Sequence, residues 1–236
     1  MNLAFNSAQS ELSNCLPHDT KQALLVGRAW LPGEYAGPSV VVVIDQQVFD
    51  ITPQVPTVSE LLNFENPCQW LRDLQPQNCL GHVDDLIVNS FCDQRDENKP
   101  WLLAPSDLQS IKACGVTFIE SLLERMIEEQ AGGDATQAIA IRQQLSRLIG
   151  ENIRDIQPGS IQAQELKKVL LQRELWSQYL EVGIGPYAEV FTKSQPMSAI
   201  GMGDDIGIRS DSTWNNPEPE LVLAVNNRGN IVGCCL

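Results

Sequence analysis

Residues 214–225 of this 236-residue chain begin as a polar turn and end as a run of β-forming residues. Side chains alternate along a strand, so Glu218 and Glu220 are predicted to share one face, about 6–7 Å apart. Pro217 and Pro219 fit the start or the edge of a strand, because proline has no backbone donor. Two carboxylates at the mouth of an apolar strand favour a hard divalent cation, Mg²⁺ or else Mn²⁺ or Ca²⁺. The alternative is a pair of solvated acids.

The composition describes a globular protein that can bury a substantial core, with 43% hydrophobic and 19% charged residues. The net charge of −14 argues against a nucleic-acid or an anionic membrane partner, because both need clustered lysine and arginine. The amino terminus lacks the basic and apolar regions of a signal peptide. No segment approaches the roughly 18 apolar residues of a membrane span. We therefore expect a cytoplasmic protein.

The cysteines, histidines and glycines of the chain limit the kinds of metal, disulfide and nucleotide site that it can form. Seven cysteines without a C-x-x-C pair predict neither a disulfide framework nor a zinc ribbon. The only histidines are His18 and His82, so any metal must be held by oxygen ligands. Gly201-Met-Gly203 is not a dinucleotide fingerprint, because Ile206 takes the third glycine position and no strand–turn–helix context follows.

Residues 1–104 are predicted to form a small β-rich domain. The aliphatic run 40–44 is typical of a buried strand, and a turn around Asp45 predicts a hairpin with residues 48–51. Thr57 opens a capping-box pattern, which predicts a short helix after it.

Residues 105–236 are predicted to form the second domain. The chain as a whole is predicted to belong to the α+β class. Apolar residues at helical spacing predict three consecutive helices between residues 106 and 180, and Ser106-Asp-Leu-Gln109 is another capping-box pattern. Residues 221–225 and 231–235 are predicted to form a hairpin whose first strand carries the two glutamates. The third helix is predicted to carry the apolar residues Leu166, Val169, Leu170, Trp176 and Tyr179.

Three motifs resemble a known family. Trp214-Asn-Asn-Pro-Glu-Pro-Glu-Leu221, Glu189-Val-Phe-Thr-Lys193 and Ile206-Gly-Ile-Arg209 resemble the fumarylacetoacetate hydrolase family, and most of all its 2-keto-3-deoxy-arabonate dehydratase branch. The run 176–236 is similar to that branch throughout. The resemblance implies that the helices lead into the start of a mixed β-roll or barrel, as in that fold. It also implies a homo-oligomer and a Mg²⁺-dependent lyase that dehydrates a 2-keto-3-deoxy sugar acid through a metal-stabilised enolate.

The resemblance also implies roles for individual residues. Glu218 and Glu220 are expected to bind the metal, which would chelate a small 2-keto acid. Lys193 is expected to clamp the substrate carboxylate or the enolate, although an ordinary surface lysine fits the same position. Glu189 is expected to be the base, and Thr192 and Ser194 are expected to donate hydrogen bonds to the substrate.

Two other functions stay open. An acylpyruvate or fumarylacetoacetate-type C–C hydrolase would need a His/Glu pair on a lid, and no clean His-x-x-Glu motif is present. His82 with Asp84 and Asp85 is either a catalytic group or, more commonly, a histidine on a surface turn. Members of the family also continue beyond a segment like 231–236 with a third acidic ligand. We therefore expect 231–236 to be a core strand of an incomplete β-structure; an inactive, truncated family member is the remaining alternative.

Overall fold

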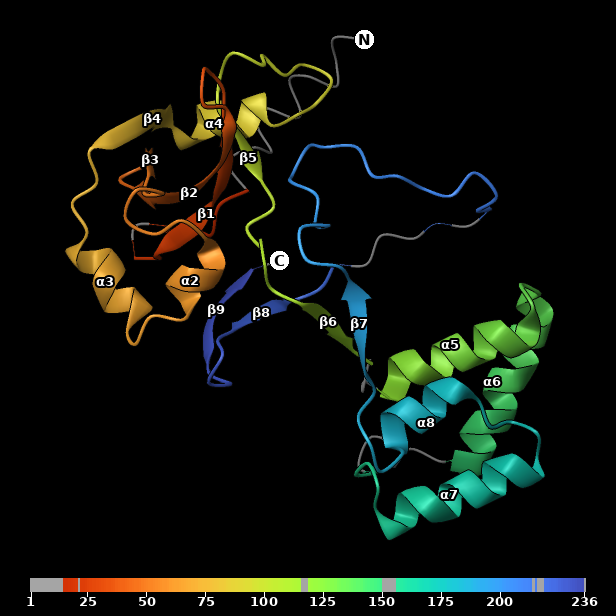
Figure 1. The fold of residues 1–236 in the computed structure, drawn as a ribbon. Helices are drawn as coiled ribbons and strands as arrows, with labels where there is room; N and C mark the ends of the chain where they lie inside the picture. The colour runs from red at the N-terminus through yellow and green to blue at the C-terminus, as the bar shows by residue number, and fades with distance from the viewer. Residues whose placement is uncertain are drawn as a thin grey trace. The chain divides into compact units, whose positions relative to one another are not determined.

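The computed structural model describes residues 15–20, 22–115, 119–149, 156–213, 215 and 219–235. The chain divides into two compact units, and Figure 1 shows the elements of each. The first unit combines residues 1–110 with 194–236, and the second consists of residues 111–193. Helices and antiparallel strands occur together, so the predicted α+β class is confirmed. No helix within the described ranges has both the length and the apolar character needed to cross a membrane.

The first unit is built around a five-stranded sheet in the order β4-β3-β2-β1-β5, and all its neighbouring pairs are antiparallel. The strands are β1 (Leu25–Leu31), β2 (Gly37–Ile44), β3 (Gln47–Asp50), β4 (Asn78–His82) and β5 (Trp101–Leu103). The helices packed on it are α2 (Val58–Leu62), α3 (Pro67–Asp73) and α4 (Val83–Asn89).

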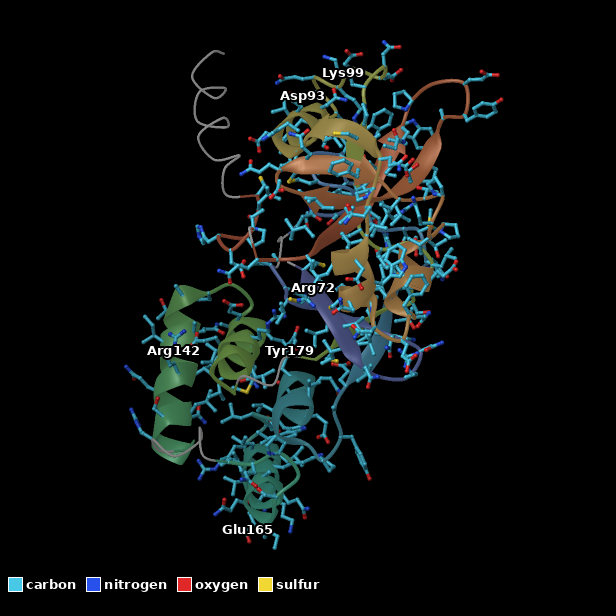
Figure 2. All side chains as sticks on the ribbon, turned by 90° about the vertical axis from the view of Figure 1, so that its left-hand side faces the viewer. Arg72, Asp93, Lys99, Arg142, Glu165 and Tyr179 are labelled. Carbon is cyan, nitrogen blue, oxygen red and sulfur yellow. The ribbon has the colours of Figure 1, made fainter. Side chains whose placement is uncertain are left out.

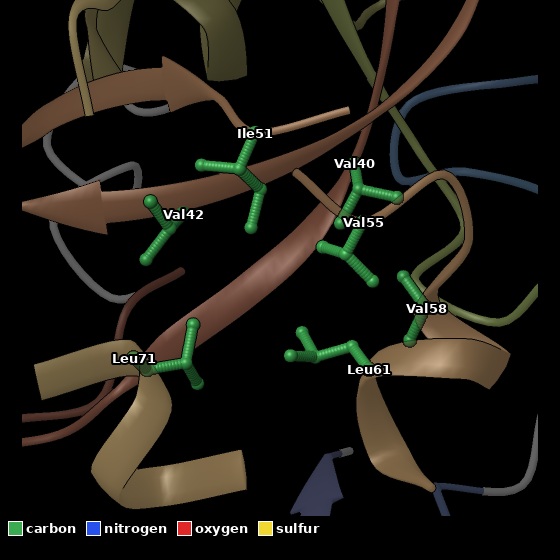
Figure 3. Packing of buried hydrophobic residues seen from close by; sticks show 7 residues of the cluster. All are labelled: Val40, Val42, Ile51, Val55, Val58, Leu61 and Leu71. Carbon is green, nitrogen blue, oxygen red and sulfur yellow. The ribbon is translucent and has the colours of Figure 1, made fainter. Parts of the chain in front are cut away.

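Strand β2 lies in the core because both of its faces are covered. Val40 and Val42 point to the face that packs on α2 and α3, and Figure 3 shows their side chains converging with Leu61 and Leu71. Val41 points to the other face, where it packs against α4. Alternating side chains that are buried on both sides explain why the sequence there is an uninterrupted aliphatic run.

Two local predictions for this unit are confirmed. The β2–β3 hairpin turns at Asp45 and Gln46, whose φ angles of 49° and 67° are typical of a two-residue type I′ turn. Helix α2 begins after Thr57, whose side chain accepts a hydrogen bond from the Glu60 N–H at 3.0 Å.

The capping-box interpretation of Ser106-Asp-Leu-Gln109 is wrong. No helix begins there; the segment is a loop that leads into β6 (Ile111–Cys114). The Asp107 carboxylate instead accepts hydrogen bonds from the first turn of α2, at Val58 and Ser59. The side chain does cap a helix, but one that lies far away in the sequence.

The second unit is a helical cluster with a two-stranded sheet of β6 and β7 (Val190–Ser194). Its helices are α5 (Ile119–Ala131), α6 (Ala135–Ile149), α7 (Ile161–Gln172) and α8 (Gln178–Ile184). Met126, Leu145, Leu170 and Leu180 each contribute a buried side chain to one shared core. The polar faces point outward, as the labelled Arg142 and Glu165 illustrate in Figure 2. The predicted helical periodicity is confirmed for α5 and α6.

The third predicted helix proves to be two, because α7 stops at Gln172. Glu174 takes a left-handed φ of 58°, and the Leu175 N–H donates to the Leu170 carbonyl at 2.9 Å. This is a Schellman ending, in which the two leucines also share the hydrophobic core. Trp176 therefore lies in the link, and Tyr179 belongs to α8.

The predicted carboxyl-terminal hairpin is confirmed as β8 (Val222–Val225) paired with β9 (Ile231–Cys235). It belongs to the first unit and is joined to the end of α2. The Asn227 N–H donates to the Asn63 side-chain oxygen at 2.8 Å, and the Arg228 guanidinium donates to the Phe64 carbonyl at 2.9 Å. Both faces of the hairpin expose apolar side chains.

Candidate functional site

The β6–β7 pair carries most of the residues singled out from the sequence. The Gly115 N–H donates to the Glu189 carbonyl at 2.9 Å, and Lys112 Nζ donates to Thr192 Oγ1 at 2.7 Å. Lys112 lies three residues before Gly115, and its partner Thr192 lies three residues after Glu189. The two strands therefore run antiparallel. Lys112 was missed in the sequence because its partner lies 80 residues away.

The alternation of side chains sorts the candidate residues onto two faces of β7. Lys193 Nζ lies 5.8 Å from the centroid of the Phe191 ring, which places those two side chains on one face. Glu189 precedes them by the same two-residue step and joins that face. Thr192, with Lys112 hydrogen-bonded to it, lies on the other, and Ser194 follows it by two residues. The alternation therefore places Glu189 and Lys193 on one side of the extended chain and Thr192 and Ser194 on the other.

The absence of a side chain at Gly115 leaves room for the Glu189 side chain. A Cβ at Gly115 would lie 2.9 Å from Glu189 Oε2 and 2.3 Å from Val182 Cγ1. Glycine therefore allows the carboxyl group to lie against the backbone at the end of β6. Lys193 and Glu189 are both exposed, so both side chains are accessible to a dissolved small molecule.

The predicted metal ligands lie elsewhere in the chain. Glu220 is exposed, and it makes no hydrogen bond or ion pair with another residue of the described ranges. Glu218 lies outside those ranges. The prediction that the first hairpin strand carries both acids is wrong for Glu220, because β8 begins at Val222. Pro219 just upstream has no N–H to donate to a ladder.

The fit of Glu220 to a divalent cation rests on its donor chemistry. Its carboxylate offers the hard oxygen atoms that Mg²⁺ prefers, and no ion pair with another described residue occupies it. Within the described ranges, which omit Glu218, no three His, Cys, Asp or Glu side chains are grouped closely enough to hold a metal ion.

The segment that leads to these carboxylates has local polar contacts. Arg209 forms a two-point ion pair with Asp211, at 3.0 and 2.6 Å, and both side chains are exposed. Ser212 Oγ donates to the Asn215 side-chain oxygen at 2.7 Å. This bond joins two residues that are three positions apart in the chain.

His82 has a structural role in this fold. It is the N-cap residue of α4, and its Nδ1 accepts a hydrogen bond from the Asp84 N–H at 3.2 Å. Asp84 is exposed beside it, with Asp84 Oδ2 3.5 Å from His82 Nδ1. This arrangement agrees with a histidine on a surface turn.

The comparisons with known proteins point to one type of enzyme. No protein-family model and no solved structure matches the chain. The chain is 44% identical, over 45 residues, to the 2-dehydro-3-deoxy-D-arabinonate dehydratase of Saccharolobus solfataricus. It is 46% identical, over 55 residues, to a Haloferax volcanii protein named "Probable 2-keto-3-deoxyxylonate dehydratase". These stretches cover 19% and 23% of this chain, and 15% and 19% of the two relatives. Over those short stretches, the chain is thus similar to two proteins named as dehydratases of 2-keto-3-deoxy sugar acids.

Proposed function

We propose that this chain contributes to a Mg²⁺-dependent dehydratase that acts on a 2-keto-3-deoxy sugar acid of the pentonate type. The observation that carries the proposal is the similarity to two relatives that are both named as dehydratases of such acids. The motif resemblance at residues 189–193 and 214–221 supports the same family. The fumarylacetoacetate hydrolase fold, a cytoplasmic location and a homo-oligomer belong to the same proposal.

In this proposal Glu218 and Glu220 hold the ion. When bound, Mg²⁺ supplies Lewis-acid polarisation of the substrate's carboxylate and keto oxygens. Glu220 is exposed and, within the described ranges, forms no hydrogen bond or ion pair, so its carboxylate is available to a dissolved cation.

Lys193 and Glu189 supply the rest of the chemistry. The Lys193 ammonium is proposed to bind the substrate carboxylate and to stabilise negative charge as it develops. Glu189, on the same face of β7, is proposed to accept the C3 proton. Loss of that proton and of the neighbouring hydroxyl releases one water molecule. Thr192 and Ser194 remain candidate hydrogen-bond donors to the substrate, on the opposite face of β7. Substituting them separately from Lys193 distinguishes the contribution of each face to turnover.

The test is turnover of 2-keto-3-deoxy-arabonate with and without EDTA, followed by formation of the semialdehyde product. We expect turnover that requires Mg²⁺ and that falls by about 100-fold or more in Lys193→Met. Lys168→Met, an exposed lysine on α7, is the matched control and should keep full activity. Hydrolysis of an acylpyruvate without any dehydration would reverse the proposal in favour of the C–C hydrolase.

A further inference from the structure

Helix α8 is held in place by two other helices of the second unit. Its residue Leu180 is fully buried in the core that the helices share. A Cβ at Gly183 would lie 1.8 Å from Leu122 Cδ1 of α5, so these two helices approach each other as closely as glycine allows. The Glu181 carboxylate also forms an ion pair with Lys167 of α7. Helix α8 is therefore packed against α5 and tied to α7.

The next residue to consider on α8 is Val182, which lies against the end of β6. A Cβ at Gly115 would be 2.3 Å from Val182 Cγ1, well inside the separation of about 3.5–4.0 Å at which carbon atoms pack. The same Cβ would be 2.9 Å from Glu189 Oε2 and 3.2 Å from Glu189 Cβ. The side chains of Val182 and Glu189 therefore both lie against the bare Cα of Gly115, and they leave no room there for a methyl group.

The backbone of Glu189 is fixed at the same place. Its carbonyl accepts the Gly115 N–H at 2.9 Å, and the pairing of the two strands continues to Lys112 and Thr192. All of these residues belong to the second unit. Because the backbone of Glu189 is paired and its carboxyl group contacts Gly115, the direction of the side chain is defined even though the residue is exposed.

We infer that Gly115 is a positioning residue for Glu189: the absence of a Cβ at Gly115 sets where the Glu189 carboxylate lies, and with it the direction from which that carboxylate accepts the substrate proton. The inference rests on the proposed function, because it deepens the role of Glu189 as the base. A general base must lie within hydrogen-bond distance of the proton, so a displacement of about 1 Å costs about 100-fold in rate. A methyl group at Gly115 would displace the carboxylate, since the two cannot occupy the same space.

NMR of the side-chain carboxyl carbons tests the position of Glu189 without substrate or metal. The Glu189 signal is identified by its loss in Glu189→Gln. The two proteins compared are Val182→Ala and the double variant Gly115→Ala with Val182→Ala. Both lack Val182 Cγ1, which would otherwise clash with the new methyl group and strain the fold. They therefore differ only by the methyl group beside the carboxylate.

We expect the Glu189 signal to shift between Val182→Ala and the double variant. Gly37→Ala is the matched control, because it adds a methyl group to a strand glycine that has no atom within 4 Å of the new Cβ. That substitution should leave the Glu189 signal where it is in the wild type. A Glu189 signal that is the same in Val182→Ala and in the double variant would overturn the inference.

Steady-state kinetics with 2-keto-3-deoxy-arabonate tests the consequence for catalysis. The double variant should have a kcat about tenfold to 100-fold below that of Val182→Ala. Its KM should change by less than about threefold, because the base acts in the transition state and does not bind the substrate. A disturbance of the fold would instead change KM as well. Equal kcat values in the two variants would overturn the inference.

A Glu189→Gln background separates this inference from the proposed function. There, adding Gly115→Ala to Val182→Ala should lower kcat by less than about twofold, because the displaced group is no longer a base. A tenfold fall in that background would show that Gly115 acts through another group, and would overturn the inference. A wild-type chain without turnover would overturn the proposed function, whereas the NMR comparison would still decide whether Gly115 sets the position of the Glu189 carboxylate.

Discussion

The Asp107 carboxylate caps a helix that begins 49 residues earlier, with its Oδ2 accepting the Val58 N–H at 2.6 Å. Its Oδ1 accepts from the Ser59 N–H at 3.0 Å and from the Ser59 hydroxyl at 2.6 Å. The residue is only 4% exposed. Burial alone would raise the pKa of Asp107, but these bonds and one from the Leu108 N–H outweigh it and lower the pKa below its ordinary value of 3.8.

We predict that Asp107→Asn lowers the free energy of unfolding by about 2 kcal/mol at neutral pH, because it weakens charged hydrogen bonds in a buried place. The folded pKa lies below the unfolded one, so this stabilisation is fully present above the unfolded pKa. It is lost as the pH falls through the folded pKa. Urea unfolding at neutral and at acid pH measures both effects.

Asp134→Asn is the control for this prediction. Its carboxylate caps α6 through the Thr136 N–H at 2.7 Å, but the residue is exposed. We expect a loss of no more than a few tenths of a kcal/mol, because asparagine caps a helix about as well as aspartate does. Equal losses for the two variants, or an Asp107→Asn variant with the acid sensitivity of the wild type, would contradict the explanation.

The two faces of β7 should respond differently to substitution. Lys193→Met removes a charge that is proposed to contact the substrate, and kcat/KM should fall by about 100-fold or more. Thr192→Val removes a hydroxyl on the opposite face, where it accepts a hydrogen bond from Lys112 Nζ, and the loss in kcat/KM should not exceed about tenfold. Steady-state kinetics with 2-keto-3-deoxy-arabonate measures both. A Thr192→Val loss larger than that of Lys193→Met would place the substrate on the other face.

The paired substitution Glu218→Gln with Glu220→Gln should abolish Mg²⁺ binding and leave the fold intact. Neutral amides are poorer ligands for a hard cation than carboxylates. Glu220 is also exposed and precedes β8, which begins at Val222. Calorimetry measures the affinity, and circular dichroism measures the fold. The control replaces Glu129 and Glu165, two exposed helical acids, by glutamine; unchanged affinity in the first variant would exclude the proposed ligands.

The β8–β9 hairpin should promote association of the chain. Leu221, Leu223 and Ile231 are 65%, 48% and 63% exposed, and the strands carry no charged residue to protect their edges. Leu223→Lys should therefore lower the mass measured by light scattering at micromolar concentration. Leu108→Lys, at an exposed leucine 59% accessible outside the hairpin, should not. A wild-type chain that is monomeric under these conditions would contradict the prediction.

Short-range patterns of the sequence determined several elements of this fold. The aliphatic run of β2, the cap at Thr57 and the β8–β9 hairpin all depend on residues within a few positions of one another. Periodicity and capping act over such distances, so the sequence predicts these elements.

Only the tertiary structure decided which distant residues meet. Asp107 caps α2 and not a helix of its own, Lys112 reaches Thr192, and Arg95 binds Asp204. The same long-range packing assigns residues 194–236 to the unit that contains the first sheet. Each contact joins residues 48 to 109 positions apart. The local sequence around a capping residue or an arginine does not indicate its hydrogen-bond partner when that partner is distant. The packing of the whole unit determines which distant residues come into contact.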